Sequence, residues 1–475
     1  MDAGPVNMDV PACLGCVERD RRIAQLERHN TQLEARLKQL EQRLEALSRA
    51  GKRQAAPFSR GVPKLDPKRP GRKSGGDYGT RAFRAVPPVI DEVHEAPLPV
   101  RCPRCGGAVV GSHVDQQYQV EIPRRPIYRQ FNVAVGRCAC CARRVQGRHP
   151  LQTSDALGCC ASQVGPGAQA AVVMLNKDLG LSQGKISRFF QSFFGIRLTR
   201  GGSCQIMLRA ADRCEPAHRA IVRRVQQGGS IVADETGWRI GGWTAWLHVA
   251  AGADAVAYLV ARRRGFEASA LLIGEDYDGK LIHDGWAGYD RFWRALHQTC
   301  LGHLLRRCHE MLETATRGAV VFPRKVKALL QEALETRDRR DARQITAAAA
   351  GAKANRLQAR MATLVRPVKT NAANERLAAH LQRHMSQLFT FLRHPDIDAT
   401  NYRAEQAIRP AVVNRKVWGG NRTEAGAAAQ SILMTVLFTA ARQGRDAIEF
   451  VSQVLRASSS SSPVRRPALL PAGSG

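Results

Sequence analysis

The feature that most constrains the fold is a series of short strand-like segments separated by glycine-containing turns, between residues 229 and 284. Three segments rich in β-branched and aliphatic residues follow one another closely and predict antiparallel strands. A helical segment and a fourth strand-like segment come next. The predicted strands cover residues 230–234, 243–251, 255–260 and 280–283, and the predicted helix covers residues 267–273.

Two acidic residues stand at the ends of these strands. Asp234 closes the first strand, and Asp284 directly follows the fourth. Three antiparallel strands, a helix and a further strand form the opening of a ribonuclease H-like domain, in which the first and fourth strands are neighbours. We therefore expect an α/β core of ribonuclease H-like type, in which folding brings Asp234 and Asp284 together.

A third acid, Glu405, lies in a stretch of helical composition. Carboxylate oxygens are hard ligands that suit magnesium or manganese. Two such ions held roughly 3.5–4 Å apart would perform phosphoryl transfer, one activating the attacking oxygen and one steadying the leaving oxygen. The alternative is that any three acids can be selected from the 41 present, without a shared site.

The charge of the chain indicates its partner. Lysine and arginine total 72 against 41 acids in 475 residues, a formal charge of +31, which predicts attraction to nucleic acid. We find no apolar run long enough to span a bilayer and no secretory signal after Met1, so we expect a cytoplasmic protein without a membrane partner. The thirteen cysteines then indicate metal ligands or buried thiols rather than disulfides.

A heptad pattern predicts a leucine zipper over residues 17–50. Leucine fills four successive d positions, and the e and g positions carry complementary charges that favour pairing with a second copy. The alternative is a helix whose leucine stripe packs on its own protein. The a positions are Ile23, Asn30, Leu37 and Leu44, and the d positions are Leu26, Leu33, Leu40 and Leu47.

Residues 89–150 contain two C-x-x-C pairs and predict a zinc-binding module. Two such pairs can point four thiolates at one ion, and a closed four-sulfur shell indicates a structural Zn²⁺. Four free structural thiols are the alternative. The predicted ligands are Cys102, Cys105, Cys138 and Cys141, the last preferred over Cys140 because it repeats the first pair's spacing. The pair Cys13 and Cys16 remains unassigned.

The remaining segments complete the domain organisation. Residues 51–88 are rich in Pro, Gly, Lys and Arg and predict a basic disordered linker, either lying along phosphates or acting as a plain tether. Residues 160–228 are helical, and a turn at Leu179–Ser182 predicts either a DNA-reading helix-turn-helix or an ordinary helical hairpin. The predicted catalytic domain covers residues 229–455, with a helical insertion at about 324–394, and a disordered tail covers residues 456–475.

Three stretches of the chain are similar to a known family. The insertion sequence 66 family of bacterial transposases is resembled by Asp234-Glu235-Thr236-Gly237-Trp238-Arg239, by His283 through Tyr289, and by Asn401 through Arg409 followed by Val413 through Trp418. Members of that family also combine a zipper, a zinc module, a helical DNA-binding segment and an acid-triad domain in this order, so the resemblance covers nearly the whole chain. It implies that Asp234, Asp284 and Glu405 are the catalytic acids and that the four cysteines bind zinc.

The chain departs from that family in one motif. Many relatives carry Cys-Trp-Ala-His after the second acid, and this chain has Cys300-Leu301-Gly302-His303. These two outer residues, with His297, could mimic a metal cluster. We interpret the cysteine and histidine instead as core residues beside the catalytic sheet.

The resemblance implies a transposase that binds transposon ends, hydrolyses a phosphodiester with two Mg²⁺ or Mn²⁺ ions and joins the 3′-hydroxyl to target DNA. Trp418 is a candidate to stack on a flipped base. Expected partners are DNA, a second copy through the zipper, and accessory proteins encoded by the element. The alternatives are a non-catalytic DNA-binding regulator and a ribonuclease H-like nuclease. The predicted phosphate contacts are Arg409, Arg415, Lys416 and Arg422.

Overall fold

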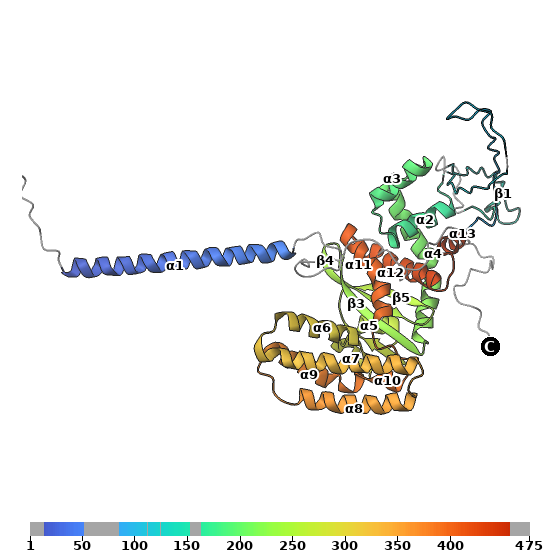
Figure 1. Cartoon of the computed structure of the whole chain (residues 1–475). Coiled ribbons are helices and arrows are strands. Elements are labelled where there is room, and N and C mark those ends of the chain that lie inside the picture. Colours follow the sequence, from blue (N-terminus) through green and yellow to red (C-terminus); the bar gives the residue numbers. More distant parts are fainter. Residues whose placement is uncertain (1–13, 52–84, 112, 124, 153–162, 457–475) are drawn as a thin grey trace, which may run out of the picture. The chain divides into compact units, whose positions relative to one another are not determined.

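The computed structural model (Figure 1) describes residues 14–51, 85–111, 113–123, 125–152 and 163–456. The chain divides into two units, Met1–Ile122 and Pro123–Gly475. Most of the predicted basic linker at 51–88 and nearly all of the predicted tail at 456–475 lie outside the described residues.

The predicted zipper segment forms one long helix, α1 (Leu14–Gly51). The helix is therefore confirmed, and its apolar stripe is open to solvent. Five of the described side chains at the a and d positions are 46–61% exposed: Ile23, Leu26, Leu33, Leu37 and Leu40. Pairing with a second copy stays a prediction.

The second unit is built on a five-stranded mixed sheet. The strands are β3 (Ser230–Ile240), β4 (Trp243–Ala251), β5 (Val256–Ala261), β6 (Lys280–His283) and β7 (Leu296–Thr299), in the order β5-β4-β3-β6-β7. β3, β4 and β5 pair antiparallel, whereas β6 lies parallel to β3 and β7 parallel to β6. The predicted adjacency of the first and fourth strands is confirmed.

The first strand is longer than the sequence predicted. It continues past Asp234 to Ile240, because residues as far as Ile240 pair with β4, ending opposite Trp243. The sequence prediction stopped early because acids and Gly237 interrupt the apolar pattern. β7 was not predicted at all, since its four residues Leu-His-Gln-Thr show no strand-like alternation.

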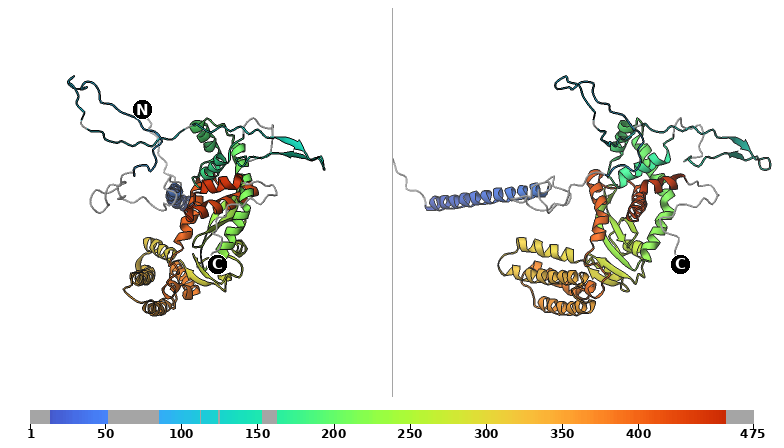
Figure 2. Two further views of the ribbon diagram at one scale, coloured as in Figure 1. Left: turned by 90° about the vertical axis from the view of Figure 1, so that its right-hand side faces the viewer. Right: turned by 45° about the vertical axis from the view of Figure 1, so that its right-hand side comes forward.

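Helices cover both faces of the sheet (Figures 1 and 2). Strand alternation divides the apolar side chains between two buried clusters, so Ile231 and Ala233 face one cluster and Val232 faces the other. The helices of the first cluster are α2 (Pro166–Lys177), α3 (Gln183–Phe194), α4 (Arg200–Gln226), α5 (Phe266–Ile273), α12 (Glu424–Arg442) and α13 (Ala447–Arg456).

The predicted helical segment at 160–228 is confirmed as helices but does not form a core of its own. α2, α3 and α4 share one buried cluster with the sheet and with α12 and α13. The turn between α2 and α3 contains Gly180, with φ +70°. The helices and the sheet therefore share one hydrophobic core, because the apolar faces of α2 and α4 are buried in the first cluster.

The helical insertion is also confirmed and begins slightly earlier than predicted. It packs beside the other face of the sheet, and its buried leucines belong to the second cluster (Figure 2). The elements on this face are α6 (Leu301–Thr314), η3 (Arg317–Val320), α7 (Val321–Asp341), α8 (Ala347–Val365), α9 (Ala372–Arg383), η4 (Met385–Gln387), α10 (Thr390–Arg393) and α11 (Tyr402–Trp418).

Helix α12 closes the outer edge of β5 with hydroxyl groups. Ser431, Thr435 and Thr439 accept hydrogen bonds from the backbone N–H groups of Val260, Tyr258 and Val256, at 2.9, 3.0 and 3.1 Å. The match is geometric, because four helical residues rise about 6.0 Å and two strand residues about 6.8 Å. These backbone N–H groups at the sheet edge, which would otherwise be unpaired, thereby gain hydrogen-bond acceptors.

The expectation that no apolar run could span a bilayer was wrong for α12. This helix is long and apolar enough by composition, but 61% of its apolar window is buried inside the fold. Its burial among the sheet and neighbouring helices is that of a core helix.

Candidate active site

The topology brings Asp234 and Asp284 to the same place. Parallel pairing matches Ser230 with Lys280 and Val232 with Ile282, and the same register continued by two residues sets Asp234 beside Asp284. Glu405 arrives from the first turn of α11, a helix that packs on β3 and β4 through the second cluster.

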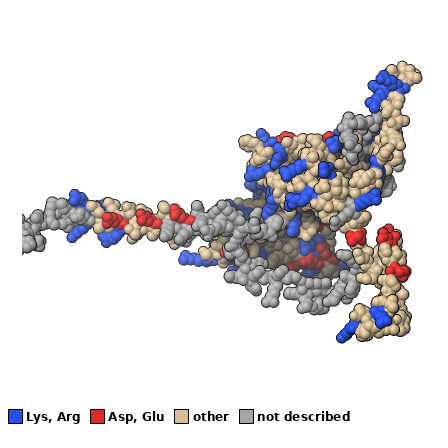
Figure 3. Space-filling model, turned by 90° about the horizontal axis from the view of Figure 1, so that it is seen from above, with Lys and Arg blue, Asp and Glu red and all other residues tan. Residues whose placement is uncertain are grey.

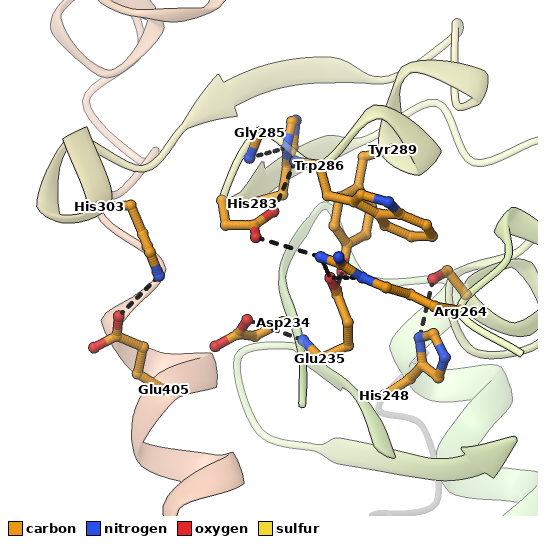
Figure 4. Close-up of polar contacts among 12 residues, drawn as sticks. Asp234, Glu235, His248, Arg264, His283, Gly285, Trp286, Tyr289, His303 and Glu405 are labelled. Carbon is orange, nitrogen blue, oxygen red and sulfur yellow. Dashed lines mark hydrogen bonds and ion pairs between the residues drawn. The ribbon is translucent and has the colours of Figure 1, made fainter. Parts of the chain in front are cut away.

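Asp284 and Glu405 both lie close enough to Asp234 to influence it. The pKa of Asp234 is raised well above its usual value, first by burial and then by the charges of Glu235, Asp284 and Glu405. Figure 4 shows the side chain of Asp234 between Glu235 and Glu405, with the carboxylate of Glu405 turned toward His303. The predicted acids therefore gather at one site, and their catalytic role stays a prediction.

A short loop presents Asp284. Its Oδ1 accepts a hydrogen bond of 2.8 Å from the backbone N–H of Trp286. The intervening Gly285 has φ +88°, and a Cβ there would lie 2.8 Å from His380 Cε1, so the turn requires glycine. The loop is therefore tightly defined by its surroundings.

Glu405 is contacted by two basic side chains of α6. His303 Nε2 and Arg306 Nη2 each lie 3.5 Å from Glu405 Oε1. Cys300 has a structural role, since it is 1% exposed and its sulfur accepts from the N–H of Asn401 at 3.3 Å, just before α11. The core interpretation therefore holds for Cys300, whereas His303 faces the site (Figure 4).

Sequence reasoning missed a fourth acid in the site, Glu235. Its side chain is fully buried and is hydrogen-bonded by Tyr289 in η2 (Ala287–Arg291) and by Arg264. The only available signal was its position beside Asp234. Partners 29 and 54 residues away could not be inferred from spacing.

The donor chemistry fits a hard divalent cation. Three carboxylates converge, and the pKa of Asp234 is raised first by burial and then by the neighbouring acids, a penalty that a bound cation would reduce. Among the described residues, no group of three or more His, Cys, Asp or Glu side chains is already arranged to hold one ion. The carboxylates would therefore have to rotate toward a bound ion.

The predicted phosphate-binding residues differ in how far they are exposed. Arg409 and Lys416 are exposed and lie four and eleven residues after Glu405, hence on the same face of α11. Arg415 is half-buried, with Nη1 3.4 Å from Thr236 Oγ1, and burial lowers its pKa. Arg422 is exposed after the helix. Lysine and arginine are also spread over the face shown in Figure 3.

Trp418 is half-buried and packs against the second cluster. Its ring lies 5.9 Å from that of Trp238 in an edge-on arrangement, and its ring N–H is buried. The structure thus gives it a packing contact at the end of α11, and stacking on a flipped base stays a prediction.

The two C-x-x-C pairs form matching turns. Gly106 N–H donates to Cys102 O at 2.8 Å, and Ala142 N–H donates to Cys138 O at 2.9 Å; both donors have positive φ, +74° and +57°. Backbone N–H groups, led by those of Arg104 and Cys141, lower the pKa of Cys102 and Cys138 respectively. The pairs belong to different units of the chain, and the four-cysteine zinc site stays a prediction.

Comparison with known proteins adds one finding. A family model described as "Transposase IS66 family" matches residues 161–429, more than half of the chain. The match includes α2 to α11 and all three acids, and it excludes α1 and the four cysteines. No curated protein sequence matches the chain.

Proposed function

Since this chain belongs to the IS66 family of transposases, we propose that it cuts DNA at the ends of a mobile element and joins the freed 3′-hydroxyl to target DNA. The observation that carries the proposal is the convergence of Asp234, Asp284 and Glu405, which lie far apart in sequence. The strand order β5-β4-β3-β6-β7, with one antiparallel and one parallel half, supports a core of ribonuclease H-like type.

The chemistry is a pair of in-line displacements at phosphorus. In the first, water attacks the phosphodiester and the 3′-oxygen leaves as a hydroxyl. In the second, that 3′-hydroxyl attacks a phosphodiester of the target DNA, and the 3′-oxygen of the target strand leaves. Two Mg²⁺ or Mn²⁺ ions would supply the Lewis acidity that activates the nucleophile and steadies the leaving oxygen. Asp234, Asp284 and Glu405 would hold them, with His303 and Arg306 orienting Glu405 from α6.

DNA contacts follow from charge and helix geometry. Arg409 and Lys416 extend the face of α11 that carries Glu405, so a phosphate backbone along this helix would lead into the site. Arg422 lies beyond the helix end, and Arg415 contributes from its position against β3. α3 exposes Lys185 and Arg188 as a further basic surface.

A structural Zn²⁺ held by Cys102, Cys105, Cys138 and Cys141 is part of the proposal. The matching turn geometry of the two pairs and the lowered pKa of one cysteine in each support it. Self-association through α1, accessory proteins encoded by the element, and a location at the bacterial nucleoid, where the DNA partner lies, complete the proposed assembly.

The decisive experiment is metal-dependent cleavage of DNA carrying the element's terminal repeats. We expect Asp234→Asn, Asp284→Asn and Glu405→Gln each to reduce Mg²⁺- or Mn²⁺-dependent nicking on the order of 10³-fold or more, with DNA binding retained. Glu424→Gln is the matched control, because Glu424 is an exposed acid paired with Arg262 outside the site.

The outcomes also separate the alternatives. Binding without nicking by the wild type would make this a DNA-binding regulator, and nicking without joining in a strand-transfer assay would make it a nuclease. Equal nicking by any one acid variant and Glu424→Gln would remove that acid from the proposed triad.

A further inference from the structure

The fourth acid of the site lies on the opposite face of the sheet from Asp234. Glu235 follows Asp234 in β3, and strand alternation turns it toward the first buried cluster. Its Oε1 accepts hydrogen bonds from Arg264 Nε, at 2.9 Å, and from Arg264 Nη2; its Oε2 accepts from Tyr289 Oη at 2.7 Å. With both oxygens committed, Glu235 is an anchor rather than a further ligand.

Arg264 is held in place by more than this ion pair. Its guanidinium carbon lies 4.9 Å from the ring centre of Trp246 and 4.8 Å from that of Trp286. Two cation–π contacts and a charged hydrogen bond at one edge restrict the guanidinium on several sides. Long arginine side chains on a protein surface are normally free to rotate, so this degree of restraint points to a role.

The restrained guanidinium faces Asp284. Arg264 Nη2 lies 3.9 Å from Asp284 Oδ2, while the backbone N–H of Trp286 holds Oδ1. Trp286 therefore serves twice, with its backbone on Asp284 and its ring on Arg264 (Figure 4). Asp284 stands in a loop beyond β6, where no ladder hydrogen bonds of a strand set its orientation.

We propose that Arg264 is a positioning residue for the transposase reaction: Glu235 anchors it, Trp246 and Trp286 restrain it, and it fixes the orientation of the Asp284 carboxylate. This inference rests on the proposed function. Two other roles predict different results. If Arg264 acted only as a nearby positive charge, it would weaken cation binding, and if Glu235 were a ligand, it would act independently of Arg264.

The test measures Mn²⁺ affinity of the full chain from the electron paramagnetic resonance signal of free Mn²⁺, together with cleavage rates. We expect Arg264→Gln, Arg264→Lys and Glu235→Gln each to weaken Mn²⁺ binding by about 10–100-fold, as residues that orient metal ligands do. Lysine should fail because it keeps the charge but lacks the planar fork. The double variant Glu235→Gln/Arg264→Gln should be no worse than either single variant, because the two act as one unit.

The matched control is Arg262→Gln, two residues away, whose partner Glu424 is exposed; it should bind Mn²⁺ like the wild type. Thermal melting identifies any variant that fails to fold, and the remaining variants then test the positioning role of Arg264. Tighter Mn²⁺ binding by Arg264→Gln would overturn the proposal in favour of a simple charge effect. Loss of binding in Glu235→Gln with Arg264→Gln unchanged would overturn it in favour of a ligand role.

Failure of the inference can be told apart from failure of the proposed function. Wild-type protein and the triple variant Asp234→Asn/Asp284→Asn/Glu405→Gln are titrated in parallel. Equal Mn²⁺ binding by these two would remove the metal site and the inference with it. A clear difference between them, with Arg264→Gln matching Arg262→Gln, would remove the inference alone.

Discussion

At the scale of single residues, the buried acid Asp234 lowers the stability of the folded protein at neutral pH. Asp234 is a buried carboxyl group surrounded by three other acids, and only the N–H of Glu235 stabilises its charged form. The pKa of the adjacent Glu235 is also raised, first by burial and then by Asp284, although the hydrogen bonds from Tyr289 and Arg264 oppose that shift. A buried acid without a basic partner is typical of a functional site, where a residue that serves activity can lower the stability of the fold.

The first prediction concerns this loss of stability. The raised pKa of Asp234 means that the folded chain keeps its proton to a higher pH than the unfolded chain, so stability falls as pH rises above the unfolded value of 3.8. Asp234→Asn should therefore raise the melting temperature of the chelator-treated protein at neutral pH, by roughly 2–4 °C for each kcal/mol gained. Near pH 3.5, at about the unfolded pKa, the gain should largely disappear.

The control is Asp396→Asn. The pKa of Asp396 is lowered, chiefly by its hydrogen bond from Lys280, so this change should give no gain at neutral pH. A lower melting temperature for Asp234→Asn than for the wild type at neutral pH would contradict the argument.

The residues that sequence alone could identify were those with a local pattern. Asp234 and Asp284 each end a predicted strand, and Glu405 lies in a recognisable stretch. Arg264 and Tyr289 gave no such signal, because their roles depend on contacts with Glu235 across 29 and 54 residues. His303 was interpreted from the sequence as a core residue, because its contact with Glu405 depends on how α6 packs against α11.

At the scale of elements, α12 shows how a helix can complete a sheet. Its hydroxyl groups at positions 431, 435 and 439 follow the period of the helix and meet alternate amides of β5. The sequence indicated the strand β5 correctly but gave no sign that its outer edge would be covered. That pairing joins segments about 175 residues apart, which no local pattern encodes.

The second prediction tests this edge. Thr435→Val keeps the shape of the side chain but leaves the buried N–H of Tyr258 without its acceptor, which should cost about 1–3 kcal/mol of unfolding free energy. Thr435→Ser keeps the acceptor and should cost about 1 kcal/mol for the lost methyl group. Urea denaturation measures both. A Thr435→Val variant as stable as the wild type would show that the hydrogen bond contributes nothing.

At the scale of the whole molecule, the composition of the chain and the order of its segments predicted the structure better than the expected domain boundaries did. The +31 charge, the helical insertion and the order of segments were all evident in the sequence. The structure does not separate the helices from the sheet at the domain boundary expected near residue 229, because α2 and α4 bury their apolar faces in the same cluster as the sheet. Amphipathic patterns show that a helix has a buried face, but not which partner buries it.

The third prediction concerns assembly through α1. The exposed leucine stripe should pair with that of a second copy, so sedimentation should give a dimer or higher species for the full chain. Replacing Leu26 and Leu33 with lysine should shift the mass toward the monomer. The matched control replaces Gln25 and Gln32, one position earlier in each heptad, with lysine and should leave the mass unchanged. A monomeric wild type, or equal masses for both variants, would contradict pairing through this stripe.

The hydroxyl row of α12 also bears on what happens when many copies crowd along the same stretch of DNA. An open outer strand would let one molecule's sheet continue into the next, and a basic protein concentrated by a polyanion would be prone to such fusion. Because side chains of the same chain already occupy those amides, growth from the β5 side is blocked. Crowding on the nucleic acid can therefore promote orderly encounters between copies without seeding β-aggregates from that side.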